Sequence, residues 1–230
     1  VYKRQAITSI VFNRTGSLIF VASADGEITV WDIERGTKIK VLKGHEKAVS
    51  GIALNRSETK LASCSYDGTV KIWNLTNFTL ARTINMKGGR VRSVAYSYDG
   101  NHLAVGLNNK SIRVLNANNY SSEFLFMGHR DVIYQVALTF DDHYLISGSM
   151  DNTIRIWDMK TGQVQKSFNE LANFINFELH PNGKDLYIAD ATPILKIWDI
   201  SALHSKPSEK EIVKNIEAPI LRGEKEVFKI

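Results

Sequence analysis

Short runs of alternating apolar and polar residues follow one another along the whole chain, and turn-forming residues separate them. Residues 49–84 contain four such runs: Val49–Leu54, Leu61–Ser65, Thr69–Asn74 and Leu80–Ile84. The intervening residues 55–58 and 66–68 include Asn, Ser, Asp and Gly, which suit tight turns. Because alternation with a period of two is typical of half-buried strands, this segment predicts four antiparallel strands.

One short string recurs along the chain at a nearly constant interval. Its copies are ITVWD at 28–32, VKIWN at 70–74, IRVLN at 112–116, IRIWD at 154–158 and LKIWD at 195–199. Their fourth residues, which are 42, 42, 42 and 41 positions apart, are Trp31, Trp73, Leu115, Trp157 and Trp198. Four strands in roughly 40 residues make one propeller blade. A helical solenoid, the alternative repeat architecture, would need a helical periodicity in place of the period of two.

The repeats resemble those of the WD-repeat family over residues 6–216. The strings that carry the resemblance are GH at 44–45 and 128–129, LASCSYDGTVKIWN at 61–74, and LISGSMDNTIRIWD at 145–158. This resemblance implies an all-β fold, a β-propeller of four-stranded antiparallel blades, five of which are visible. Because propellers of this family most often have seven blades, we expect a larger ring; a closed ring of five is the alternative.

The repeat spacing also predicts the organisation of the chain. We place the five blades approximately at 6–42, 43–84, 85–126, 127–168 and 169–216. Residues 217–230 look like the start of a further blade, and residues 1–5 look like a non-native scar. An incomplete ring leaves apolar blade faces uncovered, so we expect the chain on its own to self-associate.

In the family, a His, a Ser or Thr, an Asp and the Trp of each blade form a hydrogen-bonded tetrad. Two repeats match it fully, with His45, Ser63, Asp67 and Trp73 in the second and His129, Ser147, Asp151 and Trp157 in the fourth. Ser65 and Ser149 are alternatives on the same strand faces. Such a tetrad is chemically reasonable. A buried indole N–H needs an acceptor, and a serine hydroxyl can accept this hydrogen bond and donate its own proton to the next group.

The other repeats depart from this pattern. The third has Lys87 in the His position, Asn109 in the Asp position and Leu115 for Trp. The fifth has Glu170 in the His position and Thr192 in the Asp position. We expect these blades to be less rigid than the second and fourth.

A Ser-His-Asp hydrolase is the catalytic alternative for the same residues. Catalysis needs one asymmetric site with an oxyanion hole, whereas this set recurs at the blade period beside a shielding Trp. Cys64 lies between two serines in an apolar strand, which favours a small buried residue over a nucleophile. The six His have no metal-ligand spacing, and residues 87–90 lack the strand-to-helix context of a phosphate loop. We therefore expect no enzyme, no metal site and no cofactor.

Composition adds little to this picture. Lys and Arg exceed Asp and Glu by 29 to 24, but the charges are interspersed. There is one cysteine, and no apolar run of signal-peptide or membrane-span length occurs. We therefore expect an intracellular protein, cytoplasmic or nuclear, without membrane association.

The resemblance also implies where a partner binds. In this family, partners often lie across the face that carries the His and Asp turns. The residues expected to be exposed there in the second to fourth blades are Tyr66, Arg90, Arg92, Asn108, Tyr134 and Met150. Tyr and Arg are frequent in interface hot spots, and Met packs adaptably. The set predicts a protein or peptide partner with acidic or phosphorylated groups; a solvated basic rim is the alternative.

The expected function is therefore a non-catalytic scaffold or adaptor. Two alternatives remain open. A substrate receptor of a cullin-type ubiquitin ligase carries a docking box that residues 146–160 resemble, although Lys160 stands where that box normally ends in Arg. A nucleic-acid-binding propeller agrees with the basic excess, but the sequence lacks a continuous basic stripe.

Overall fold

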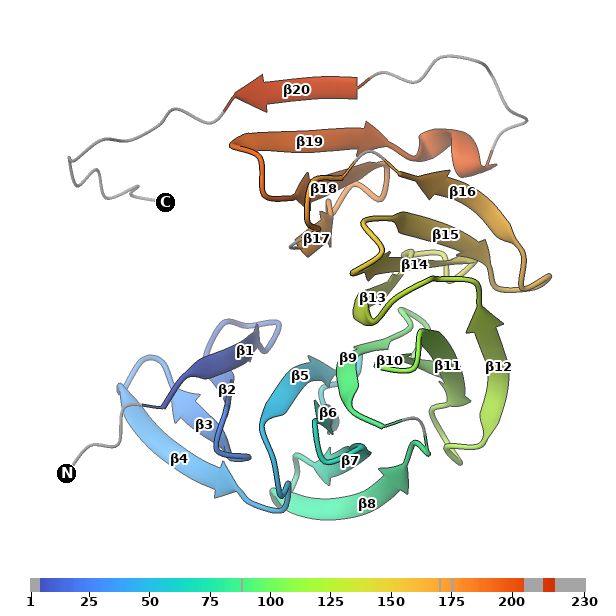
Figure 1. The fold of residues 1–230 in the computed structure, drawn as a ribbon. Coiled ribbons are helices and arrows are strands. Elements are labelled where there is room, and N and C mark those ends of the chain that lie inside the picture. The colour runs from blue at the N-terminus through green and yellow to red at the C-terminus, as the bar shows by residue number, and fades with distance from the viewer. Residues whose placement is uncertain (1–4, 88, 170, 175, 205–212, 218–230) are drawn as a thin grey trace. The chain divides into compact units, whose positions relative to one another are not determined.

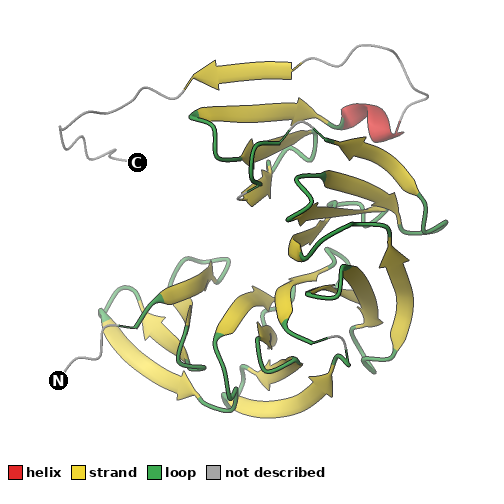
Figure 2. Cartoon of the chain, in the orientation of Figure 1, coloured by secondary structure: helices red, strands yellow, loops and turns green. Residues whose placement is uncertain are grey.

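The fold consists almost entirely of strands (Figures 1 and 2). The computed structural model describes residues 5–87, 89–169, 171–174, 176–204 and 213–217. The expected scar, apart from Gln5, therefore lies outside the described residues, as do Glu170 and residues 218–230. The chain divides into two compact units, Val1–Glu170 and Leu171–Ile230.

The first unit contains four sheets, each made of four consecutive antiparallel strands. The first is formed by β1 (Ile7–Phe12), β2 (Leu18–Ser23), β3 (Ile28–Asp32) and β4 (Thr37–Leu42). The second is formed by β5 (Val49–Leu54), β6 (Lys60–Ser65), β7 (Thr69–Asn74) and β8 (Thr79–Asn85). The third is formed by β9 (Val91–Tyr96), β10 (His102–Leu107), β11 (Ser111–Asn116) and β12 (Ser122–Met127). The fourth is formed by β13 (Ile133–Leu138), β14 (Tyr144–Ser149), β15 (Ile154–Asp158) and β16 (Val164–Phe168).

The second unit contains one more sheet of the same kind. Its strands, in sheet order, are β17 (Asn176–Leu179), β18 (Asp185–Ala189), β19 (Ile194–Asp199) and β20 (Val213–Glu217). A short 3-10 helix, η1 (Ser201–His204), follows β19. The predicted all-β class and the predicted five four-stranded propeller blades are confirmed.

Within the first unit, the blades follow one another around a common centre with the first strand of each blade innermost (Figure 1). An apolar cluster fills each of the three junctions between neighbouring blades. At the third and fourth blades, Gly106 on β10 makes this packing possible, because a Cβ there would lie 2.8 Å from Ile133 Cγ2. The core of the unit therefore lies between blades, as expected for sheets that bury both faces.

The turns of the first unit lie on two opposite faces. Residues 24–27, 66–68, 108–110 and 150–153 connect second to third strands, and we call their side the tetrad face. Residues 13–17, 55–59, 97–101 and 139–143 connect first to second strands, and we call their side the hairpin face. Because antiparallel neighbours reverse direction, each blade contributes turns to both faces.

Buried tetrads and a candidate interaction surface

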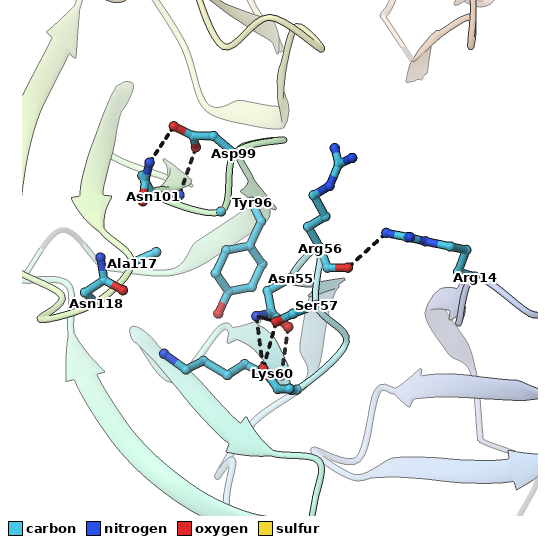
Figure 3. Close-up of a pocket in the computed structure, with 12 residues that line it drawn as sticks. Arg14, Asn55, Arg56, Ser57, Lys60, Tyr96, Asp99, Asn101, Ala117 and Asn118 are labelled. Atoms are coloured by element: carbon cyan, nitrogen blue, oxygen red, sulfur yellow. Dashed lines mark hydrogen bonds between the residues drawn. The ribbon is translucent and has the colours of Figure 1, made fainter.

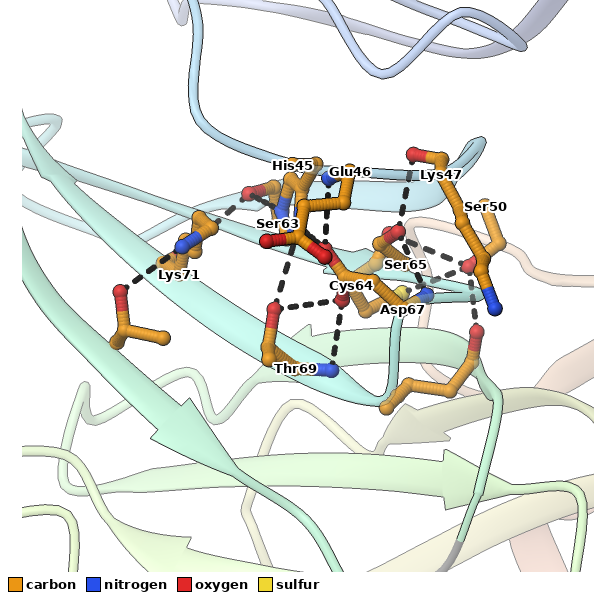
Figure 4. Close-up of polar contacts among 12 residues, drawn as sticks. His45, Glu46, Lys47, Ser50, Ser63, Cys64, Ser65, Asp67, Thr69 and Lys71 are labelled. Atoms are coloured by element: carbon orange, nitrogen blue, oxygen red, sulfur yellow. Dashed lines mark hydrogen bonds and ion pairs between the residues drawn. The ribbon is translucent and has the colours of Figure 1, made fainter.

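The four polar residues expected in the second blade lie in one hydrogen-bonded chain. His45 Nδ1 is 2.8 Å from Asp67 Oδ2, and His45 Nε2 is 2.8 Å from Ser63 Oγ (Figure 4). The indole Nε1 of Trp73 donates to the same Ser63 Oγ at 2.8 Å. This series of hydrogen bonds connects the linker before β5 with β6, β7 and the turn between them.

The chemistry of the partners fixes the protons. The ionised carboxylate of Asp67 only accepts, so His45 carries its proton on Nδ1. The indole N–H only donates, so Ser63 Oγ accepts it. Because burial lowers the pKa of His45, Nε2 carries no proton at neutral pH and accepts the hydroxyl proton of Ser63. The imidazole is therefore neutral and fully bonded within the blade.

The fourth blade repeats this arrangement. His129 Nδ1 lies 2.9 Å from Asp151 Oδ2, and both His129 Nε2 and Trp157 Nε1 lie 2.8 Å from Ser147 Oγ. The alternative serine, Ser149, has a different role, because its hydroxyl donates to the carbonyl of Asp131 and accepts from the amide of Asp151. Ser65 makes the matching bonds in the second blade.

Acid is expected to destabilise the protein in two steps. Burial lowers the pKa of His45 and His129 below 6.5, against the opposing effect of their carboxylate partners. The unfolded chain then binds protons more readily than the folded protein does. The contribution of the two imidazoles to stability is therefore complete above about pH 6.5 and falls at lower pH. Burial alone would raise the pKa of Asp151, but hydrogen bonds from Thr153, Arg130 and His129 lower it to about 2.

The contribution of the carboxylates to the stability of the folded protein is complete above about pH 4 and is lost toward pH 2. Thermal unfolding followed by circular dichroism from pH 8 to pH 2 measures both steps. A midpoint that does not change between pH 7 and pH 5 would contradict the assignment of neutral, buried imidazoles.

The tetrads have the atoms of a Ser-His-Asp triad but lack the access that catalysis requires. Ser63 and Ser147 are 0% exposed, and in each blade the indole N–H donates a hydrogen bond to the serine hydroxyl. Cys64 is also buried, and burial raises the pKa of its thiol to about 12. Among the described residues, no group of three or more His, Cys, Asp or Glu is placed to hold a metal ion. No described helix is long and apolar enough to cross a membrane.

The Asp position of the fifth blade was assigned wrongly from the sequence. Thr192 does not replace the carboxylate; it donates its amide and hydroxyl protons to Asp190, as Thr69 does to Asp67. The buried side chain of Asp190 also forms an ion pair with the partly buried Lys196 at 2.7 Å. Burial alone would raise the pKa of Asp190, but Lys196 and Thr192 hold it well below its usual range. Two extra residues before β19 displaced the carboxylate from the position that a constant spacing predicts.

The third blade satisfies its core without a tetrad. Leu115 is buried in the place of the Trp and has no N–H that needs an acceptor. Asn109 accepts hydrogen bonds from the amide and hydroxyl of Ser111, which preserves the turn. Lys87, in the His position, is exposed.

Four of the six residues expected at the interaction surface gather around one guanidinium group. Arg92 Nη1 donates to Tyr66 Oη at 2.6 Å. The guanidinium carbon of Arg92 lies 4.7 Å from the centre of the Tyr66 ring and 5.4 Å from that of Tyr134. Arg90, which is exposed, lies over the same Tyr66 ring at 5.4 Å. We call Tyr66, Arg90, Arg92 and Tyr134 the Arg–Tyr cluster.

The side chains of the other two expected residues form no hydrogen bond or ring contact with this cluster, within the part of the chain that the structure describes. Asn108 approaches it through its backbone, whose amide donates to the carbonyl of Arg90 at 2.9 Å. Met150 is 44% exposed in the corresponding turn of the fourth blade. The repeat spacing indicated which residues share a face but not which side chains touch.

Comparison with known families agrees with the geometry. A family model described as WD domain, G-beta repeat matches residues 2–32, 36–74, 78–116 and 121–158, which is more than half of the chain. The chain belongs to the WD40 family. The matched WD40 repeats lie in the first unit, and the fifth blade follows them with its own four strands. A search of curated proteins gave no match. WD40 propellers generally act as non-catalytic scaffolds for protein interactions.

The hairpin face carries a set of residues that was not expected from the sequence. The turn positions 16, 58, 100 and 142 are one repeat apart and are Gly, Glu, Gly and Asp. All four have positive φ. The alternation of glycine and carboxylate was visible in the sequence, but its consequence depends on which groups of the preceding blade lie within reach.

Proposed function

We propose that this WD40 protein is a scaffold or adaptor that binds an acidic or phosphorylated peptide of a partner protein through the Arg–Tyr cluster. The family supports the general role, and the position of Arg92 supports the specific one. WD40 proteins are typically intracellular, which agrees with the expectation from the single cysteine.

The observation that carries the proposal is that the guanidinium of Arg92 is held in position but has no carboxylate partner among the described residues. Its guanidinium lies near two tyrosine rings and is held by the Tyr66 hydroxyl, while its Nε is buried without a hydrogen-bond partner. Among the described residues, no carboxylate lies within ion-pair distance of Arg90 or Arg92. A fixed guanidinium of this kind binds carboxylate or phosphate groups at a small entropic cost.

Charge reversal at the cluster tests the proposal. The R90E/R92E variant is expected to lose binding at least about 100-fold toward those peptides in a phosphorylated and acidic library that the wild type binds, because two charge-assisted contacts disappear. R92K keeps the charge but loses the planar fork of donors, so we expect a loss of about tenfold. Fluorescence anisotropy with labelled peptides measures both.

The matched control is K40E/R82E, which changes the net charge equally on the outer strands β4 and β8. It should bind the same peptides as the wild type does. Equal binding by R90E/R92E and the wild type would refute the role of the cluster. If RNA or DNA binds instead, with an affinity that falls steeply with salt, the nucleic-acid alternative is favoured.

A further inference from the structure

Two carboxylates join neighbouring blades on the hairpin face. Glu58 of the second blade accepts a hydrogen bond from the amide of Arg14 in the first. Asp142 of the fourth blade accepts bonds of 2.7 Å from the amides of Tyr98 and Asp99 in the third. In both cases a side chain from a left-handed turn position, with φ of 55° and 59°, reaches back to the turn of the preceding blade.

The junction between the second and third blades lacks this carboxylate. The corresponding residue is Gly100, which has φ of +77°, and a Cβ built there would meet nothing within 4 Å. The amides that correspond to those of Tyr98 and Asp99 belong to Arg56 and Ser57. Neither amide has an acceptor among the residues that the structure describes.

A polar cavity of about 560 Å³ opens at this junction (Figure 3). Its lining residues include three basic ones, Arg14, Arg56 and Lys60, and one acidic one, Asp99. The guanidinium of Arg56 stacks on the Tyr98 ring at 3.6 Å, and Arg14 Nη2 donates to the Arg56 carbonyl at 3.1 Å. Most of the remaining lining consists of amide and hydroxyl groups. The Tyr96 ring points toward the turn of Asn55 and Ser57, and its hydroxyl is buried without a hydrogen-bond partner.

We propose that this cavity binds a small polar molecule that carries a phosphate monoester. The phosphate oxygens accept from the amides of Arg56 and Ser57, where Glu58 and Asp142 provide a carboxylate at the neighbouring junctions. The excess of two positive charges in the lining matches the charge of about −1.5 to −2 on a phosphate monoester at neutral pH. The volume suits a ligand the size of a sugar phosphate, and the polar lining suits its hydroxyl groups.

The proposal does not depend on the Arg–Tyr cluster, which lies on the tetrad face. Isothermal titration calorimetry of the whole chain tests it with glucose 6-phosphate, glycerol 3-phosphate, inorganic phosphate and glucose. At least one organic phosphate is expected to bind more tightly than inorganic phosphate, and glucose without phosphate is expected not to bind.

The decisive variant is G100D, which supplies the missing carboxylate from within the protein. It is expected to weaken organic phosphate binding at least about tenfold, because its side chain occupies the amides and repels the ligand. The control G100A carries the same backbone strain at a φ of +77° as G100D but no carboxylate, so it should bind within about threefold of the wild type. Thermal unfolding establishes that both variants fold.

Any of three results would overturn the proposal. The first is the absence of binding to the wild type for both organic phosphates at millimolar concentration. The second is a G100D variant that is folded and binds as tightly as the wild type does. Binding of glucose as tight as that of glucose 6-phosphate would also refute the assigned role of the phosphate.

Discussion

Replacement of Ser147 by alanine is expected to lower the free energy of unfolding by roughly 2–5 kcal/mol, because it leaves two buried polar atoms without partners at about 1–3 kcal/mol each. These atoms are His129 Nε2 and Trp157 Nε1, which both contact Ser147 Oγ at 2.8 Å. Both side chains are buried, so water cannot replace the hydroxyl. Urea denaturation followed by circular dichroism measures the loss.

A double-mutant cycle separates the network from a general effect of the substitution. Trp157→Phe removes the indole donor, so Ser147→Ala in that background leaves only His129 Nε2 unpaired. We therefore expect the S147A/W157F variant to cost less than the sum of the two single variants, by about 1 kcal/mol or more. Additive effects would show that the serine does not couple the two rings.

The first and third blades show why the serine matters only where its partners are present. Val21 and Val105 stand at the position of Ser147 in those blades. In the first blade, Trp31 Nε1 donates to Thr29 Oγ1 at 2.9 Å instead. In the third, Leu115 has no donor. An apolar residue is acceptable at this position when no neighbouring polar group depends on it.

Alanine at Ile52 is expected to destabilise the protein by roughly 2–5 kcal/mol, whereas alanine at Ile10 should cost less than about 1 kcal/mol. The two residues occupy the same position of the innermost strand in the second and first blades. Ile52 is 8% exposed within the apolar cluster between these blades, and Ile10 is 53% exposed. The same chemical change therefore creates a cavity at one site and removes surface at the other.

Urea denaturation of the I10A and I52A variants makes the comparison directly. A loss at Ile10 equal to that at Ile52 would mean that Ile10 is covered in solution. Ile7, Ile10 and Phe12 are each more than half exposed along β1, and an apolar patch of this kind promotes association. Light scattering of the wild type and I10A tests whether self-association involves this strand.

The amino-acid sequence by itself determined the blades and the tetrads. The spacing of 42 residues and the alternation of apolar positions specify four strands per repeat, since strand pairing within a blade joins neighbouring segments. His45 and Asp67 are 22 residues apart and belong to one blade, so the motif was sufficient to bring them together. In the fifth blade the motif contained two more residues before β19, and the constant spacing led to Thr192 in place of Asp190.

Only the tertiary structure decided the relations between blades. Arg92 lies beside Tyr66 and Tyr134 because three blades bring side chains from different repeats to one point of the tetrad face. On the hairpin face, Asp142 reaches the preceding blade. Gly100 leaves the corresponding amides without an acceptor among the described residues, and a cavity lies beside them. The repeat places equivalent residues in register, but whether they touch depends on side-chain length and packing across the junction, which a one-dimensional pattern does not contain.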